Sequence, residues 1–332
     1  MTKLITLPEN DEMENVMNKE TAKAAQAKIA EITQNIATVI RGKSDKILLT
    51  VICLLSEGHI LIEDVPGVGK TSLVSALAKT IDCGYSRIQF TPDVMPSDIT
   101  GFSIYNQKTG EFEFRPGTAM SNLVLADEIN RASAKTQSAL LEIMEERQVT
   151  VDSNTYRMQP PFMVLATQNP IDTLGTYQLP EAQIDRFMMQ ISLGYPEKDS
   201  EIEILEQVRQ AKAEVGSVIT SGDLVQLIDL RHQVFTDRSI SDYIVSIVEA
   251  TRDHTDIRLG CSPRGSIALY EASKAYALSQ GRNYVIPDDV QFLAPHVLAH
   301  RMILARSARA ENRMASDIIA EILSKIAVPT AQ

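Results

Sequence analysis

The residues most able to do chemistry lie in one run of the sequence, Glu63-Asp64-Val65-Pro66-Gly67-Val68-Gly69-Lys70-Thr71-Ser72. Gly67 and Gly69 let backbone N–H groups turn inward around a phosphate, because no Cβ blocks the approach. Lys70 could then reach the β- and γ-phosphates of a nucleotide, and the Thr71 hydroxyl could ligate Mg²⁺. The run therefore predicts a phosphate-binding loop. The strict pattern has Gly where Asp64 stands, so a loop that merely resembles a phosphate cradle is the alternative.

Two adjacent carboxylates, Asp127 and Glu128, follow the apolar run 123–126. Asp127 is placed to hold Mg²⁺ or its water shell, and Glu128 can orient and activate an attacking water. Such a pair at a strand end is a weak signal alone and a strong one downstream of a phosphate loop. The other acidic cluster of this region is interpreted as the solvated face of a helix. It consists of Glu142, Glu145 and Glu146.

Three further side chains could contact a nucleotide. Asn169 could hydrogen-bond the γ-phosphate or the lytic water, or could simply belong to an Asn-Pro turn. Arg186 is either an inert surface residue or one that projects toward a neighbouring subunit's nucleotide and stabilises charge in the transition state. Arg264 follows Ser262-Pro263 at the start of a helix, where a cation is unfavourable against the helix macrodipole. We therefore expect Arg264 to reach back to the phosphates and to sense the nucleotide.

The elements that must position these residues alternate between short strands and helices from about residue 43 to 195. Several of the strands are apolar without alternation, as in a parallel sheet that is buried on both faces. Leu73, Ala76, Leu77 and Thr80 have the spacing of a helix that packs on such a sheet. The pattern predicts an α/β nucleotide-binding domain. The expected strands are Ile60–Glu63, Ser86–Phe90, Leu123–Ala126, Met163–Thr167 and Met188–Leu193.

Two β-hairpins interrupt this alternation. The first has arms at 102–105 and 111–114 with a turn that ends at Gly110, and the second has arms at 148–151 and 155–158. Surface decoration is the alternative interpretation for each hairpin.

The remainder of the chain has helical patterns only. Ser221 and Ser241 are expected N-caps, Ser262 is a third one before a proline, and Gly281 closes the helix that follows. Further helices are expected around Asp288-Asp289 and over 310–326. We therefore predict a polar lead-in over residues 1–25, an α/β domain over 26–195 and a smaller, all-helical domain over 196–332.

Composition limits the remaining possibilities. The chain has 332 residues, a formal net charge of −11 and three isolated cysteines, Cys53, Cys83 and Cys261, which argue against a disulfide framework or a zinc site. His296 and His300 are four residues apart, but no third ligand is evident, so we expect surface or packing roles. No apolar run is long enough to span a membrane and no secretory signal is visible, which indicates a cytoplasmic protein. The acidic charge disfavours binding along a nucleic-acid backbone.

Taken together, these motifs resemble those of the MoxR family of AAA+ ATPases, within the group that carries a helix-2 insert. The resemblance covers about residues 35–310. Besides the phosphate loop it rests on Phe90-Thr91-Pro92-Asp93, Phe114-Arg115-Pro116-Gly117, Ala126-Asp127-Glu128-Ile129-Asn130-Arg131-Ala132, Ala166-Thr167-Gln168-Asn169-Pro170, Glu181-Ala182-Gln183-Ile184-Asp185-Arg186-Phe187 and Ser262-Pro263-Arg264.

The resemblance implies roles for particular residues. The first hairpin would be the helix-2 insert and the second the pre-sensor-1 insertion. Asn169 would be sensor 1, Arg186 the arginine finger and Arg264 sensor 2, and residues 40–43 would line the adenine pocket. The catalytic residues implied are Lys70, Asp127, Glu128, Asn169, Arg186 and Arg264. Nucleotide contacts are expected from Ile40, Gly42, Pro66, Gly67, Val68, Gly69, Lys70, Thr71, Ser72 and Arg264, and metal contacts from Thr71 and Asp127.

The family further implies a Mg²⁺-dependent ATPase that forms a homo-oligomeric ring, usually a hexamer, and remodels client proteins, often together with von Willebrand factor A domain proteins. A nucleic-acid motor or loader of the same superfamily is the alternative. The acidic charge and the absence of tryptophan for base stacking weigh against this alternative. A nucleotide-gated scaffold that does not hydrolyse ATP is a third reading, which the filled catalytic positions disfavour.

Overall fold

Five apolar strands form one parallel sheet at the centre of the computed structural model, which describes residues 4–5, 17–169, 177–208 and 215–331. The strand order is β10-β2-β9-β6-β3, and each strand pairs in parallel with its neighbour. At least one helix lies between each of these strands and the next one along the chain, as the crossover connections of a parallel sheet require. The strands are β2 (Ile60–Glu63), β3 (Tyr85–Gln89), β6 (Leu123–Asp127), β9 (Met163–Gln168) and β10 (Met189–Ile191).

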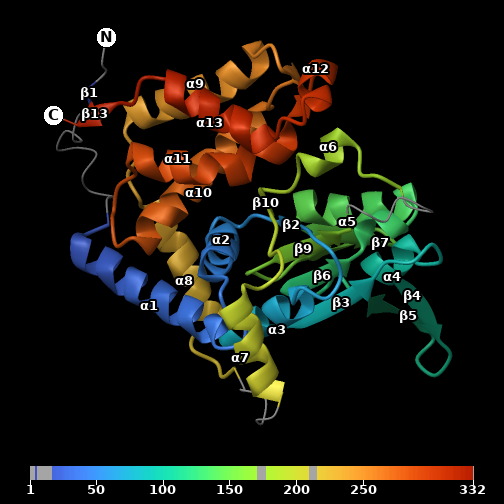
Figure 1. Cartoon of the computed structure of the whole chain (residues 1–332). Coiled ribbons are helices and arrows are strands. Elements are labelled where there is room, and N and C mark those ends of the chain that lie inside the picture. The colour runs from blue at the N-terminus through green and yellow to red at the C-terminus, as the bar shows by residue number, and fades with distance from the viewer. Residues whose placement is uncertain (1–3, 6–16, 170–176, 209–214, 332) are drawn as a thin grey trace.

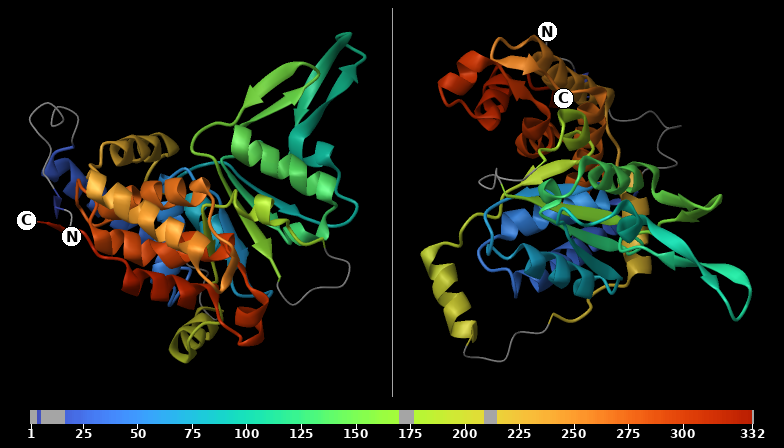
Figure 2. Two further views of the ribbon diagram at one scale, coloured as in Figure 1. Left: turned by 90° about the horizontal axis from the view of Figure 1, so that it is seen from above. Right: turned by 90° about the vertical axis from the view of Figure 1, so that its right-hand side faces the viewer.

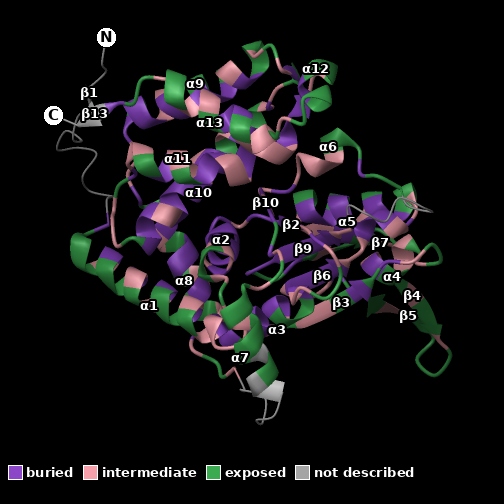
Figure 3. Cartoon of the chain, viewed as in Figure 1, coloured by how far each residue is buried: buried purple, intermediate pink, exposed green. Residues whose placement is uncertain are grey.

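The two faces of this sheet contribute to two separate hydrophobic cores, because successive side chains of a strand point to opposite faces. Leu123 and Leu125 of β6 join a core with the first three helices and the helical half of the chain. Val124 and Ala126 of the same strand join a second core with α5. Figure 3 shows the central strands β2, β6 and β9 as mostly buried, whereas the edge strand β3 is mostly intermediate or exposed. The helices of this half are α1 (Lys19–Ala37), α2 (Ser44–Leu55), α3 (Lys70–Thr80), α4 (Pro96–Thr100), α5 (Ala134–Glu146) and α6 (Glu181–Ile184), with a short 3₁₀ turn at Ile129–Arg131.

Both expected hairpins are present and project together from the α/β half (Figure 2, left). The first consists of β4 (Gly101–Asn106) and β5 (Glu111–Pro116), and the second of β7 (Gln148–Val151) and β8 (Asn154–Arg157). Phe114 of the first stacks on Tyr156 of the second with ring centroids 3.9 Å apart. This aromatic contact ties the two hairpins to each other.

The C-terminal half is mainly helical, and in Figure 1 the segment 238–325 lies above and to the left of the sheet, whereas the helix at 198–208 lies below it. Ser262 caps α10 and Gly281 follows its end with a φ of 71°, both as predicted. The elements are α7 (Lys198–Val208), α8 (Ser221–His232), α9 (Arg238–Asp253), β11 (Ile257–Leu259), α10 (Pro263–Ser279), α11 (Pro287–Leu298), a 3₁₀ turn (Ala299–Arg301), β12 (Ile303–Leu304), α12 (Arg306–Ala310) and α13 (Ala315–Lys325).

Several local expectations were wrong. Ser241 lies inside α9, because Asp237 accepts the capping hydrogen bond four residues earlier. Thr220 rather than Ser221 caps α8, through a reciprocal pair of hydrogen bonds with Asp223. The segment 310–326 is not one helix, since α12 ends at Ala310 and α13 begins at Ala315.

Strand pairing also occurs outside the central sheet and the hairpins. β11 and β12 pair antiparallel, so the C-terminal half is helical but not purely so. β1 (Leu4–Ile5) pairs in parallel with β13 (Thr330–Ala331), which brings the two ends of the described chain together (Figure 1). α1 already begins at Lys19, within the region expected to be a lead-in. No helix in the described ranges combines the length and the apolar character needed to cross a bilayer.

Candidate functional site

The phosphate-binding loop leaves β2 and enters α3 with the backbone shape that its glycines permit. Gly67 and Gly69 have φ values of 89° and 97°, in the left-handed region that favours glycine. A Cβ built on either residue would have no atom within 4 Å, so the inner side of the loop is an open cradle. Lys70 begins α3, is largely buried, and donates its Nζ to the carbonyl oxygen of Asp64 at 3.0 Å. These features fit a bound phosphate group.

Asp64, the one departure from the strict loop pattern, has a structural role. Its carboxylate accepts hydrogen bonds from the Ser192 hydroxyl at 3.0 Å, from the backbone N–H of Leu193, and from that of Gly194 at 3.2 Å. Asp64 is only 6% exposed, so these bonds form away from solvent. The carboxylate thus ties the start of the phosphate loop to the chain that leaves β10. Glycine at this position could not make that connection.

The two predicted carboxylates share one cavity of about 400 Å³ with the phosphate loop. Asp127 ends β6, and Glu128 follows in a left-handed conformation with a φ of 57°, a strained geometry for a residue other than glycine. The buried Thr167 hydroxyl on β9 donates to Asp127 Oδ1 at 2.6 Å and accepts the backbone N–H of Glu128 at 2.9 Å. Thr167 therefore fixes both carboxylate residues, a role that sequence reasoning missed.

Arg87 and Gln89 on β3 were also missed, and both line this cavity. Arg87 Nη2 donates to Asp127 Oδ2 at 2.6 Å, and Gln89 Nε2 donates to Glu128 Oε2 at 3.0 Å. Arg131 contacts the same Glu128 oxygen at 3.1 Å. The available signal was the spacing of Arg87 and Gln89, because residues two apart on a strand share a face. This face of β3 thus places the positive charge of Arg87 and the amide of Gln89 beside the two carboxylates.

The remaining predicted contacts lie around the same edge of the sheet. Asn169 directly follows β9, whose last residue pairs with Glu63 of β2, so it lies beside the strand that leads into the loop. Val68 packs against the core. Gly42, in the expected adenine segment, lies close to Ser200 near the start of α7, and Lys43 donates to the carbonyl of Tyr195 at 2.8 Å. The loop residues that line the cavity are Pro66, Gly67, Gly69, Lys70, Thr71 and Ser72.

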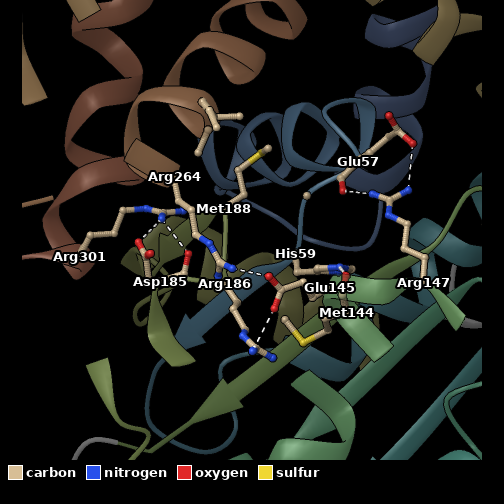
Figure 4. Close-up of a pocket in the computed structure, with 13 residues that line it drawn as sticks. Glu57, His59, Met144, Glu145, Arg147, Asp185, Arg186, Met188, Arg264 and Arg301 are labelled. Atoms are coloured by element: carbon tan, nitrogen blue, oxygen red, sulfur yellow. Dashed lines mark hydrogen bonds and ion pairs between the residues drawn. The ribbon is translucent and has the colours of Figure 1, made fainter. Parts of the chain in front are cut away.

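Neither predicted arginine lines the phosphate cavity of its own chain. Arg186 and Arg264 lie together in a second cavity, of about 290 Å³, where both pair with Glu145 (Figure 4). Arg186 Nη2 is 2.9 Å from Glu145 Oε2, and Arg264 Nη2 donates to Oε1 of the same carboxylate. The expectation of a purely solvated acidic face is therefore wrong for Glu145. The expectation that Arg264 reaches its own phosphate loop is not met in this structure.

Hydrogen bonds to the backbone carbonyls on either side of Arg186 fix the chain at this point. Arg301, in the helical half, donates to the carbonyls of Asp185 and Phe187, the two residues that flank Arg186, each at 2.7 Å. Arg301 also pairs with the Asp185 carboxylate, which accepts the Ser262 hydroxyl at 2.8 Å. The chain around Arg186 is thus fastened to the helical half two residues before Arg264.

The two cavities lie at opposite edges of the parallel sheet. Met188 N, before β10, donates to the carbonyl of His59, before β2, at 2.8 Å, and this marks the amino-terminal edge. Asp64 contacts the residues after β10 and marks the carboxyl-terminal edge. The five-residue step from His59 to Asp64 spans about 16 Å at the rise of a parallel strand. Arg186 therefore lies at the edge of the sheet opposite the phosphate loop of its own chain.

Burial shifts the pKa values of the cysteines and of two histidines, His59 and His300, away from neutral pH. All three cysteines are free, and burial raises the pKa of Cys83 to about 12 and that of Cys261 to about 11. Burial lowers the pKa of His59 to about 4 and that of His300 to about 3. His300 donates Nε2–H to the carbonyl of Phe187 at 3.0 Å, which is a packing role as predicted.

Comparison with known proteins agrees with this architecture. The model of the ATPase family associated with various cellular activities (AAA) matches residues 59–189, and that of the AAA lid domain matches residues 249–322. A parallel sheet with a phosphate loop on β2, carboxylates on β6 and a helical lid defines an AAA+ ATPase. A crystal structure of a candidate ATPase from Cytophaga hutchinsonii has a TM-score of 0.88 and 42% identity, and the match covers 94% of this chain and 98% of that one.

Two curated relatives specify the family. The chain is 52% identical to the uncharacterized protein YeaC of Bacillus subtilis, with 91% of this chain and 95% of that protein covered. It is 41% identical to Chaperone MoxR1 of Mycobacterium tuberculosis, with 88% of this chain and 80% of that protein covered. The chain belongs to the MoxR family of AAA+ ATPases, as its motifs predicted.

Proposed function

We propose that the protein hydrolyses ATP to ADP and phosphate at the cavity on the carboxyl-terminal edge of its sheet. The observation that carries this proposal is that one cavity joins the open glycine loop to Lys70, Asp127 and Glu128. Backbone N–H groups of the loop and the Lys70 ammonium would bind the phosphates, together with the N-terminus of α3. Glu128, held by Gln89 and by its backbone bond to Thr167, would orient the attacking water.

A magnesium ion would suit the same cavity, because the Thr71 hydroxyl and the Asp127 carboxylate are the hard oxygen donors that it prefers. When bound, Mg²⁺ would neutralise charge on the phosphates. Asp127 already accepts hydrogen bonds from the Thr167 hydroxyl and the Arg87 guanidinium, which orient its carboxylate in the cavity. Asn169, at the tip of the neighbouring strand, would contact the γ-phosphate or the water.

We further propose that Arg186 and Arg264 act on the nucleotide of an adjacent subunit. Both guanidinium groups lie at the edge of the sheet opposite their own phosphate loop. An arginine supplied from a neighbour can accelerate phosphoryl transfer by about 10³–10⁵-fold. Closed rings repeat one such contact around the assembly, so we propose a homo-oligomeric ring, of six subunits by family resemblance.

Client remodelling would use the two hairpins, which project together and expose aromatic residues such as Phe112 at 73%. The name of the relative Chaperone MoxR1 supports a protein client. By family resemblance we propose a cytoplasmic location and von Willebrand factor A domain proteins among the partners.

Subunit mixing tests the proposed site. Arg186→Ala and Lys70→Ala proteins should each lose ATPase activity, the first because it cannot assist a neighbour and the second because it cannot bind nucleotide. In mixed assemblies a Lys70→Ala subunit still supplies its arginines to an Arg186→Ala subunit, so turnover should partly return. If mixed rings are confirmed by affinity co-purification and turnover stays at background, the trans role is wrong.

Remodelling requires a separate test with a trapped enzyme. A Glu128→Gln protein should bind ATP but not hydrolyse it, and should therefore retain clients for identification by mass spectrometry. A client that is activated equally well by the Glu128→Gln protein would contradict ATP-driven remodelling.

A further inference from the structure

We propose that Glu145 is the positioning residue that presents Arg186 and Arg264 as one unit to the neighbouring nucleotide. The inference rests on the proposed trans action of these arginines. It assigns a role to a carboxylate that no nucleotide motif includes. Figure 4 shows Glu145 between the two guanidinium groups, with one carboxylate oxygen directed to each.

The three side chains come from three separate parts of the fold. Glu145 lies in the last turn of α5, Arg186 follows α6, and Arg264 lies in the first turn of α10 in the lid. Two guanidinium groups repel each other, so a shared carboxylate is the simplest way to hold them side by side. Bonds of ionised donors to an ionised acceptor are also shorter and more directional than neutral ones. Glu145 therefore determines the separation of the two positive charges.

Stability does not explain this arrangement. The side chains of Glu145, Arg186 and Arg264 are 36%, 29% and 47% exposed, and ion pairs at such exposure contribute little to folding. A carboxylate at the C-terminal end of α5 is also unfavourable against the helix macrodipole. Replacing Glu145 should therefore leave the fold intact while it releases the arginines. The remaining explanation is that Glu145 sets the positions of the two guanidinium groups.

The backbone around the arginines is fixed independently of Glu145. Arg301 holds the carbonyls on both sides of Arg186, and the Asp185 carboxylate accepts the Ser262 hydroxyl. This clamp leaves only the long side chains of Arg186 and Arg264 to be oriented. The loss of Glu145 should therefore free the guanidinium groups without separating the two domains.

Neighbouring carboxylates supply matched controls. Glu142 and Glu146 lie on the same helix and are exposed, and neither makes an ion pair or a hydrogen bond within the described part of the chain. Glu142→Gln and Glu146→Gln remove the same charge from the same helix without removing an ion pair to either arginine, although both residues line a neighbouring cavity together with Arg186. They separate a positioning effect from a general effect of net charge.

The expected defect concerns turnover rather than nucleotide binding. In Glu145→Gln the kcat for ATP should fall by about 10–100-fold, because misplacing a catalytic group by about 1 Å costs up to about 100-fold. The Kd for ATP at the chain's own site should change less than about twofold, because that cavity lies at the other edge of the sheet. Glu145→Asp keeps the charge on a shorter side chain, and its kcat should lie between that of the parent protein and that of Glu145→Gln.

Subunit mixing distinguishes this proposal from the one on which it rests. A Glu145→Gln subunit has an intact nucleotide site, so Lys70→Ala neighbours with ordered arginines should restore its turnover. Mixing Glu145→Gln with Arg186→Ala should restore nothing, because both subunits present defective arginines. All variants should assemble, as sedimentation would show, and should melt within about 2 °C of the parent protein.

Each outcome bears on one proposal. If Arg186→Ala with Lys70→Ala recovers turnover but Glu145→Gln keeps the parent kcat, the positioning role is wrong and trans action stands. The positioning role is also wrong if Glu145→Gln recovers nothing with Lys70→Ala, or if Glu142→Gln loses as much activity. If Arg186→Ala with Lys70→Ala fails in confirmed mixed rings, the trans action itself is wrong.

Discussion

Substituting Asp64 by glycine would restore the strict phosphate-loop pattern, and the structure predicts that it destabilises the protein. The Asp64 carboxylate accepts the backbone N–H groups of Leu193 and Gly194 and the Ser192 hydroxyl. An orphaned buried donor costs about 1–3 kcal/mol. Glycine also increases the conformational entropy of the unfolded chain, by up to about 1 kcal/mol. We therefore expect Asp64→Gly to lower the free energy of unfolding by about 3–5 kcal/mol.

Scanning calorimetry of the nucleotide-free protein would measure this change. A loss of about 3–5 kcal/mol corresponds to a decrease in Tm of about 4–7 °C for a chain of this size. Asp64→Asn is the comparison variant, because it keeps one acceptor oxygen and replaces the other by an NH2 group that cannot accept, and it should show about half of the decrease. An Asp64→Gly protein that melts at or above the temperature of the parent would refute the tethering role.

Two other predictions follow from contacts within the sheet. Thr167→Val should reduce ATP turnover by about 10–100-fold with little change in ATP affinity, because it removes the hydroxyl that orients Asp127 and Glu128. Steady-state kinetics would measure turnover, and equilibrium binding would measure affinity. Unchanged turnover would contradict this role of Thr167. The pKa values of His59 and His300 are lowered to about 4 and about 3, so below pH 6.5 the unfolded chain binds protons that the folded chain excludes. The contribution of these two histidines to the free energy of unfolding should be fully present above pH 6.5. It should fall by roughly 1.4 kcal/mol per pH unit for each histidine as the pH drops toward 4. Urea titrations at several pH values would measure this slope, and His59→Gln should reduce it.

The sequence predicted best those features that short segments determine. The strands β2, β6 and β9 were located to within one or two residues, because unbroken apolar runs suit a sheet that is buried on both faces. Both hairpins were found, although the second turn is two residues, Asp152 and Ser153, with positive φ values rather than three. Ser241 illustrates the limit, because Asp237 could cap the same helix and only the fold decides between the two.

Contacts between strands could not be predicted in the same way. Thr167 and Arg87 each reach Asp127 from 40 residues away along the chain. Strand order and register place them there, and a shift of one residue would turn each side chain to the opposite face. The sequence identified the carboxylates as candidates because their position follows from one strand. It left out the groups that hold them, because those positions depend on three strands at once.

Arg264 shows how a local signal can indicate function without identifying the site. A cation in the first turn of α10 opposes the helix macrodipole, and on this ground the sequence predicted a role beyond folding for Arg264. Which nucleotide Arg264 could contact depends on where the lid packs against the α/β half. The Arg301 and Ser262 contacts fasten the lid to the amino-terminal edge of the sheet, about 16 Å from the loop edge. On the proposed trans action, a guanidinium group held there beside Arg186 would contact the nucleotide of an adjacent subunit, so the packing of the lid rather than the motif would determine its partner.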